Sequence, residues 1–132
     1  MTRFAMPAIA AAALALAAPA PASAQLATYC GGVVHANAFY ANVLSNGRTA
    51  NVEYHGQMQN IDPQRRKVTA NLVQVQQVGL FRVMRMISSF ELNPFEQKSI
   101  SLLTLYVNNP SGTGAPNALE VGRQIRMTCR FG

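Results

Sequence analysis

The chain has 132 residues, of which 49% are hydrophobic and 12% are charged, and it carries a formal net charge of +6. That length accommodates one ordinary domain, and the hydrophobic fraction excludes a disordered or low-complexity protein. Its two cysteines are too few for a disulfide-dense miniprotein or for a structural zinc site of their own.

Residues 1–24 have the order of a secretory signal peptide. A basic residue near the start is followed by an unbroken apolar run over residues 8–18, and residues 22–24 read Ala-Ser-Ala, the pattern of a cleavage site. The apolar run is shorter than the roughly 18 residues of a spanning helix. We therefore expect cleavage after Ala24 and one mature domain, residues 25–132, that is periplasmic or secreted and does not span a membrane.

Export to an oxidising compartment changes the expected state of the two cysteines. Cys30 and Cys129 are an even pair in an oxidising compartment, which predicts a structural disulfide between the two ends of the domain. A redox-active pair is the alternative, but it needs a Cys-x-x-Cys motif or a nearby base, and neither is visible. Cys30 has the outward parity of the strand that follows it, so we expect Gly31 and Gly32 to shift the register and turn Cys30 inward.

The clearest local pattern is a hairpin over residues 33–60. Asn46-Gly47 lies between two β-rich runs and favours a type I′ turn, because both central residues tolerate positive φ. A two-residue loop pairs Ser45 with Arg48, and the numbers of paired residues then sum to about 93.

This register predicts one buried and one half-polar face. The half-polar face carries Glu53 and His55. The same register places His35 on the opposite face from His55, so the two histidines cannot share a metal ion. The buried face carries Val33, His35, Asn37, Phe39, Ala41 and Val43 from the first strand, with Ala50, Val52, Tyr54 and Met58 from the second.

The rest of the mature chain predicts further strands joined by turns. Asp62-Pro63 suits a turn, and the β-branched residues after it predict a strand over residues 67–76, although the same start also suits a short helix near residues 63–77. Beyond this, we expect an extended segment over 80–92, a turn at Asn93-Pro94, an apolar strand over 99–108, a loop over 109–117, and a strand over 124–131 with Ile125, Met127, Cys129 and Phe131 inward.

About six or seven short strands in one mature domain predict an all-β fold. Residues 90–102 have the alternation typical of paired strands in Ig-like domains. We therefore predict an antiparallel β-sandwich with an Ig-like pattern, or a small barrel. An α+β fold, with a short helix near residues 63–77, is the alternative.

Sequence motifs for catalysis are few. The chain has no G-x-S-x-G, no Walker A motif and no H-E-x-x-H. Glu53 and His55 share a strand face, so a small hydrolase or metal-dependent enzyme built on this pair is one hypothesis. A solvated strand face explains the same two residues, and no third partner is identifiable. We therefore expect no enzyme activity and no cofactor.

Arginines predict a binding surface instead. Arg123, Arg126 and Arg130 run along the last predicted strand, and by parity Arg126 and Arg130 point outward. The guanidinium fork holds carboxylates, phosphates and sulfates, although a solubilising face is the alternative role. We predict a non-catalytic binding or assembly module of the cell envelope, whose partner is an envelope protein, an acidic glycan or an anionic lipid headgroup. Nucleic acid is not expected, because no aromatic side chains accompany these arginines for base stacking.

Overall fold

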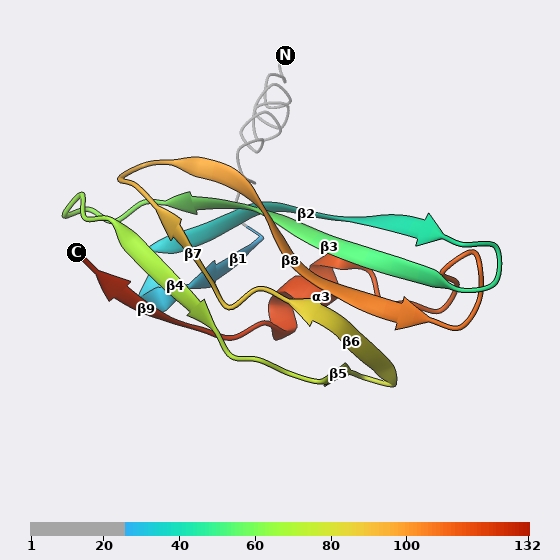
Figure 1. Cartoon of the computed structure of the whole chain (residues 1–132). Helices are drawn as coiled ribbons and strands as arrows, with labels where there is room; N and C mark the ends of the chain where they lie inside the picture. The colour runs from blue at the N-terminus through green and yellow to red at the C-terminus, as the bar shows by residue number, and fades with distance from the viewer. Residues whose placement is uncertain (1–25) are drawn as a thin grey trace, which may run out of the picture.

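The computed structural model describes residues 26–132, which form two antiparallel sheets and one short helix (Figure 1). The predicted signal peptide and its cleavage site lie outside the described residues. The all-β prediction is confirmed, with a curled large sheet and a small second sheet. The alternative helix near residues 63–77 is wrong, because the chain pairs there as a strand, β4 (Val68–Leu72).

The large sheet has six strands and the small sheet has three. In spatial order the large sheet contains β1 (Ala27–Tyr29), β2 (Val34–Ser45), β3 (Ala50–Asn60), β8 (Gln97–Val107), β6 (Phe81–Met86) and β5 (Gln77–Val78). The small sheet contains β7 (Ser89–Leu92), β4 and β9 (Met127–Phe131). The described residues thus hold nine strands rather than six or seven, partly because the extended segment over 80–92 divides into β6 and β7.

The β2–β3 hairpin forms at the predicted place but in a different register. Ser45 pairs with Ala50 rather than with Arg48, which leaves a four-residue loop. The side-chain oxygen of Asn46 accepts hydrogen bonds from two later loop amides, at 2.8 and 2.9 Å. These bonds satisfy the amides of the wider loop, so the two-residue turn is not needed.

A bulge in β2 changes which of its residues face the core. The register shifts between Ala36 and Ala38, so Val34 and Ala36 are buried before the shift, whereas Phe39 faces inward after it. An extra residue in one strand reverses the parity of everything beyond it. The predictions that His35 and Asn37 lie on the buried face are therefore wrong, whereas Val33, which precedes the strand, packs against the core as predicted.

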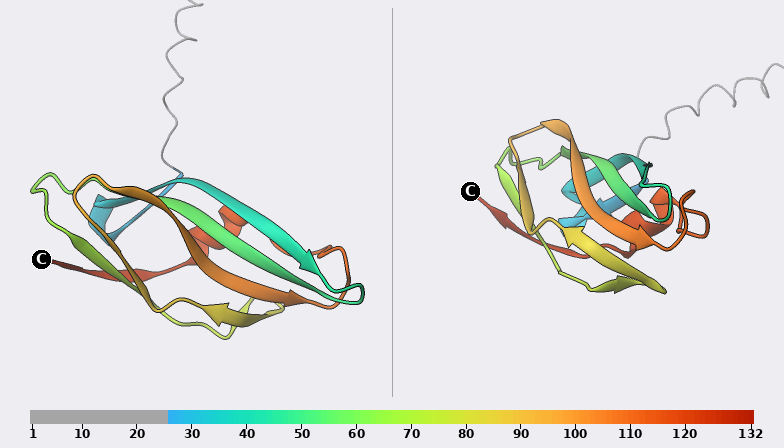
Figure 2. Two further views of the ribbon diagram at one scale, coloured as in Figure 1. Left: turned by 45° about the horizontal axis from the view of Figure 1, so that its top comes forward. Right: turned by 45° about the vertical axis from the view of Figure 1, so that its right-hand side comes forward.

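The core lies between the large sheet on one side and the small sheet with helix α3 (Ala118–Gln124) on the other (Figure 2). Burial alternates strictly along β3, which shows that this strand has one face on the core. The largest fully buried apolar side chains are Tyr54, Met58, Leu92, Leu102, Leu105, Val34, Val68, Val107 and Val121. Each such side chain stabilises the fold by about 1.5–3 kcal/mol relative to exposure.

The disulfide between Cys30 and Cys129 is present, as predicted, with the two Cα atoms 5.6 Å apart. Gly31 and Gly32, at φ of 71° and 95°, form the single 3-10 turn η2 (Cys30–Gly32) that redirects the chain after Cys30. Because β1 is an edge of the large sheet and β9 is an edge of the small one, the bond fastens the two sheets together.

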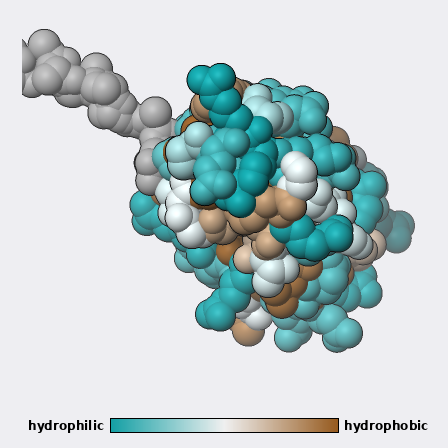
Figure 3. Space-filling model, turned by 90° about the vertical axis from the view of Figure 1, so that its left-hand side faces the viewer, coloured by the Kyte–Doolittle hydropathy of each residue, from teal (hydrophilic) through white to brown (hydrophobic). Residues whose placement is uncertain are grey.

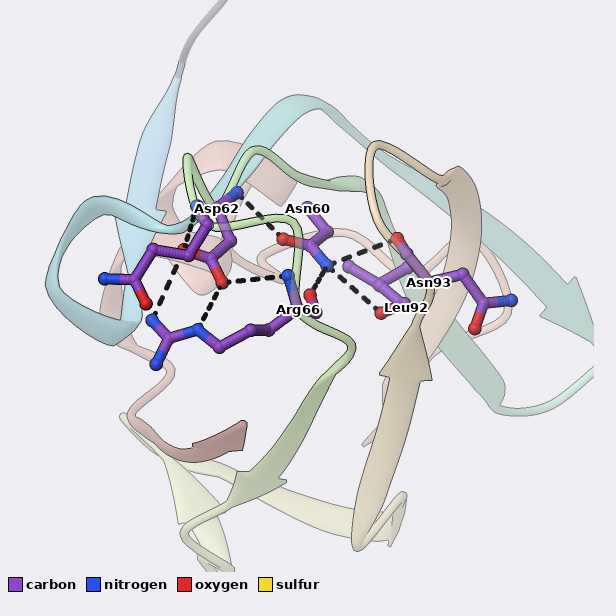
Figure 4. Close-up of polar contacts among 6 residues, drawn as sticks. Asn60, Asp62, Arg66, Leu92 and Asn93 are labelled. Carbon is purple, nitrogen blue, oxygen red and sulfur yellow. Dashed lines mark hydrogen bonds and ion pairs between the residues drawn. The ribbon is translucent and has the colours of Figure 1, made fainter. Parts of the chain in front are cut away.

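A buried polar corner carries the chain from β3 to β4 (Figure 4). The side-chain amide nitrogen of Asn60 lies 2.8 Å from the carbonyl of Arg66, and 3.2 Å from the carbonyls of both Leu92 and Asn93. Its side-chain oxygen accepts a bond from the amide of Asp62 at 2.9 Å. Asn60 is 0% exposed, so these bonds replace the water that its amide group would otherwise bind.

Asp62 completes the corner through an ion pair. Its Oδ2 lies 2.7 Å from Nε of Arg66, and its carboxylate also accepts the amides of Gln64 and Arg66. The hydrogen bond from the Arg66 side chain, above all, lowers the pKa of Asp62, so this carboxylate stays ionised at neutral pH. The Arg66 guanidinium also lies 4.2 Å from the ring centre of Phe131, which connects the corner to the end of β9.

Helix α3 was not predicted, and it shortens the last predicted strand to residues 127–131. The side chain of Asn117 caps the helix, because its Oδ1 accepts the amide of Glu120 at 2.8 Å. Two core tyrosines hold this region in place: Tyr29 donates to the carbonyl of Gly122 at 2.6 Å, and Tyr54 donates to that of Pro116 at 2.7 Å. Burial raises the pKa of both tyrosines to about 12, so both remain hydrogen-bond donors at neutral pH.

Gly122 has a packing role that makes a testable prediction. A Cβ at this position would lie 2.4 Å from two ring atoms of Phe39, which is far inside van der Waals contact. Although alanine normally stabilises a helix by about 1 kcal/mol relative to glycine, we expect Gly122→Ala to destabilise the protein by about 1–3 kcal/mol. Urea unfolding measures this change. The double change with Phe39→Leu should recover part of the loss, and a more stable Gly122→Ala protein would contradict the prediction.

Candidate functional site

The structure places the three predicted binding arginines on the C-terminal segment, but not all on one strand. Arg130 lies on β9 and Arg126 lies just before it, and both side chains are exposed, as their parity predicts. Arg123 is in the last turn of α3, so its predicted place on the last strand is wrong. The helix forms because its N-cap satisfies the first turn, which the apparent alternation of the sequence did not reveal.

These arginines differ from most other basic side chains of the described residues in having no partner. Within residues 26–132, four side chains form ion pairs with carboxylates: Arg66, Lys67, Arg85 and Lys98. Arg65 and Arg82 lie over aromatic rings. Arg123, Arg126 and Arg130 have neither kind of partner, and Arg48 is the remaining basic side chain of that kind in the same part of the chain. The unpartnered positive charge is thus concentrated in the last ten residues.

Arg130 lies on the outer face of the small sheet. In the strand register it is beside Thr69, which in turn is beside Glu91 on β7. Glu91 pairs with Lys67 at 3.6 Å, so this carboxylate of the face already has a basic partner. The outer face of β9 therefore presents Arg130 to solvent without an ion-pair partner among residues 26–132.

The end of the molecule that carries the C-terminus also exposes aromatic rings. Phe95 is 52% exposed and Phe131 is 38% exposed, and each lies beneath an arginine, Arg65 and Arg66 respectively. Figure 3, which views this end, shows apolar residues gathered within an otherwise hydrophilic surface. The arginine stems cover part of this apolar surface and keep their charges in water.

A cavity of about 110 Å³ adjoins Arg126. Its wall is formed by residues 73–78, which comprise the link from β4 and the whole of β5, together with the end of β6, the middle of β8 and residues 121–126. Seven of its ten lining residues are apolar, and the polar ones are Gln77, Gln124 and Arg126. The cavity thus combines an apolar wall with one unpartnered positive charge.

Glu53 and His55 do lie together on the outer face of β3. Nε2 of His55 is 3.6 Å from Oε1 of Glu53, and the other Glu53 oxygen is 3.9 Å from Nη2 of Arg85. The imidazole stacks on the ring of Tyr40, with centroids 4.8 Å apart, and the Tyr40 hydroxyl is 2.6 Å from Oγ of Ser99. Within residues 26–132 no third histidine, cysteine or carboxylate joins this pair to make a metal site.

The prediction that His35 and His55 lie on opposite faces is wrong. Because of the bulge in β2, His35 pairs with Gln59 and shares the outer face with His55. Gln59 is four residues along β3 from His55, which is roughly 13 Å at about 3.3 Å per residue. The two imidazoles are therefore on one face but too far apart to bind one metal ion.

Sequence reasoning missed the cavity and the buried corner. Both depend on segments that are distant in sequence, such as residues 73–78 with β8 and Asn60 with Leu92. A local signal existed for α3, namely Asn117 followed three residues later by Glu120.

Comparisons with protein-family models, with curated proteins and with solved structures gave no significant match to this chain. Within residues 26–132 the one α-helix is too short to cross a membrane.

Proposed function

We propose that the protein is a non-catalytic binding module of the cell envelope, periplasmic or secreted, which holds an anionic partner through Arg126 and Arg130, with Arg123 contributing. The observation that carries this proposal is the absence of partners for these three side chains among the described residues, where most other basic side chains have one. The Cys30–Cys129 disulfide supports the location, because such bonds persist in oxidising compartments.

The chemistry of arginine defines the partner. A planar guanidinium forms two parallel hydrogen bonds to a carboxylate, a phosphate or a sulfate. These groups occur on acidic proteins, on lipid headgroups and on acidic glycans. Each exposed contact contributes only about 0–1 kcal/mol, so several arginines must act together. Binding must then weaken as salt screens the charges, since the Debye length is about 8 Å at 0.15 M salt.

The double change Arg126→Ser with Arg130→Ser is expected to weaken binding to anionic probes about tenfold, as the loss of two contacts of about 0.7 kcal/mol each implies. The probes are phosphatidylglycerol vesicles, heparin and a poly-glutamate peptide, which separate the lipid, glycan and protein partners. Binding is measured by sedimentation or titration at several salt concentrations, on protein whose circular dichroism shows that it is folded.

A charge-matched control tests whether position or net charge decides the effect. The double change Arg48→Ser with Arg82→Ser removes the same charge from two exposed positions elsewhere, in the β2–β3 loop and on β6. It should leave binding within about twofold of the unsubstituted protein, because a local contact is lost only at the proposed surface. The proposal is wrong if both double variants bind equally, or if the protein binds none of the three probes.

A further inference from the structure

We infer that the cavity beside Arg126 binds a medium-chain monocarboxylate, with the alkyl chain in the cavity and the carboxylate on the Arg126 guanidinium. The inference deepens the proposed function and rests on it in one respect, because Arg126 belongs to both. The inference adds a class of ligand and an apolar binding cavity, neither of which the arginine surface alone specifies.

The apolar wall of the cavity includes side chains that are incompletely covered. Val73 and Val75 line it, yet they are 47% and 42% exposed. These two valines lie on the irregular segment that follows β4, and the deeper wall includes Leu103 of β8, which is buried. An open, apolar hollow of this kind gains free energy when an alkyl group displaces water from it.

The charge lies at one side of this hollow. The amide of Val73 donates to the carbonyl of Arg126 at 2.9 Å, just beyond the last β4–β9 pair, Leu72 with Met127, so these two lining residues are neighbours. Arg126 has no carboxylate partner in residues 26–132, and Gln77 and Gln124 supply further polar groups on the wall. An apolar hollow with a single guanidinium fits a ligand that has one apolar end and one anionic end.

The volume of the cavity limits the length of the ligand's alkyl chain. A cavity of about 150 Å³ holds a benzene molecule, which has six carbons. The present cavity of about 110 Å³ therefore holds a slightly smaller group, about four or five carbons. Because Val73 and Val75 line the cavity and are also exposed, a chain of about six to eight carbons fills it and continues along them. Each methylene that is buried should raise affinity about fourfold.

Titration with sodium octanoate, followed by amide chemical shifts in the intact mature protein, tests the inference. We expect octanoate to perturb the amides of residues 73–78 and 121–126 and to bind more tightly than hexanoate, which in turn binds more tightly than butyrate. 1-Octanol should bind about tenfold more weakly than octanoate, since it lacks the charge.

Two variants separate the charge from the apolar wall. Arg126→Gln should lower octanoate affinity about tenfold and leave 1-octanol affinity unchanged, whereas Val75→Gln should weaken both ligands. Both residues are exposed, so both variants are expected to fold. Arg48→Gln, the matched control, should leave octanoate binding unchanged, because Arg48 is exposed in the β2–β3 loop and does not line the cavity.

The results also separate this inference from the proposed function. If octanoate does not bind, binds equally well to Arg126→Gln, or perturbs amides elsewhere, the inference is overturned. If it is overturned while the Arg126 and Arg130 double variant still loses binding to the anionic probes, the proposed function stands. If octanoate binds as expected and no anionic probe does, the cavity assignment stands and the proposed arginine surface is wrong.

Discussion

Replacing Asn60 with alanine is expected to lower the free energy of unfolding by about 3 kcal/mol, although the sequence shows it only as the last residue of the predicted hairpin. The side-chain amide of Asn60 lies within hydrogen-bond distance of the carbonyls of Arg66, Leu92 and Asn93. Removing it takes a donor from all three carbonyls, of which that of Leu92 is in a buried bond, whereas that of Asn93 keeps the amide of Glu96 as a donor. Each such group costs about 1–3 kcal/mol, and relaxation recovers part of the sum.

The position of these carbonyls explains why the effect should be large. Asn60 ends β3 in the large sheet, whereas Leu92 ends β7 in the small sheet. One side chain therefore connects the two layers at the corner where the chain crosses between them (Figure 4). Its loss weakens the attachment of the sheets as well as the local turn.

Urea unfolding at neutral pH gives the measurement. Asn42→Ala is the matched control, since Asn42 is exposed on β2, and it should change stability by no more than about 0.5 kcal/mol. Asn60→Asp tests the mechanism, because it keeps the shape but replaces the donor with a carboxylate facing carbonyl oxygens. It should destabilise at least as much as alanine. A loss of less than about 1 kcal/mol in Asn60→Ala would show that the corner is maintained by other contacts.

Asn60 also shows which features could not be predicted from the sequence. Asp62-Pro63, two residues after Asn60, indicates a turn, and the turn is present. Burial of the Asn60 amide is decided by Leu92 and Asn93, which arrive from a strand some thirty residues later. A local pattern predicts the backbone, but it contains nothing about the distant carbonyls that use the side chain.

The register of the β2–β3 hairpin was likewise only partly predictable from the sequence. Strong apolar alternation in β3 made its buried face predictable, and residues 50–58 lie as predicted. The bulge in β2 falls at Ala36–Ala38, where small and polar side chains alternate weakly and give no signal of a change in parity. His35 therefore lies on the outer face with His55, rather than on the predicted buried face.

The candidate site was predictable only in part. Exposure of Arg126 and Arg130 follows from the alternation of Met127, Cys129 and their neighbours. The absence of ion-pair partners depends on where the few carboxylates lie in three dimensions. The cavity depends on residues 73–78 crossing near β8, which no local pattern encodes.

Removing the disulfide by Cys30→Ala with Cys129→Ala is expected to lower the free energy of unfolding by about 2–5 kcal/mol. The bond closes a loop of 99 residues. Without it, the unfolded chain gains the conformational freedom that the cross-link denies, which the chain-entropy model values at about 4.7 kcal/mol for a loop of about 100 residues. The folded state should persist, because the core between the sheets does not include the bond as its main contact.

The bond also has a local effect that a general entropic account does not contain. β9 is an edge strand that pairs only with β4 within the described residues, and its second attachment is Cys129. In the double variant we expect the amides of β9 to lose more hydrogen-exchange protection than those of β3, which lies inside the large sheet. Reductant provides the control: it should bring the unsubstituted protein close to the stability of the double variant and leave the double variant unchanged. Equal stability of the oxidised protein and the double variant, or equal loss of protection in β9 and β3, would contradict this role.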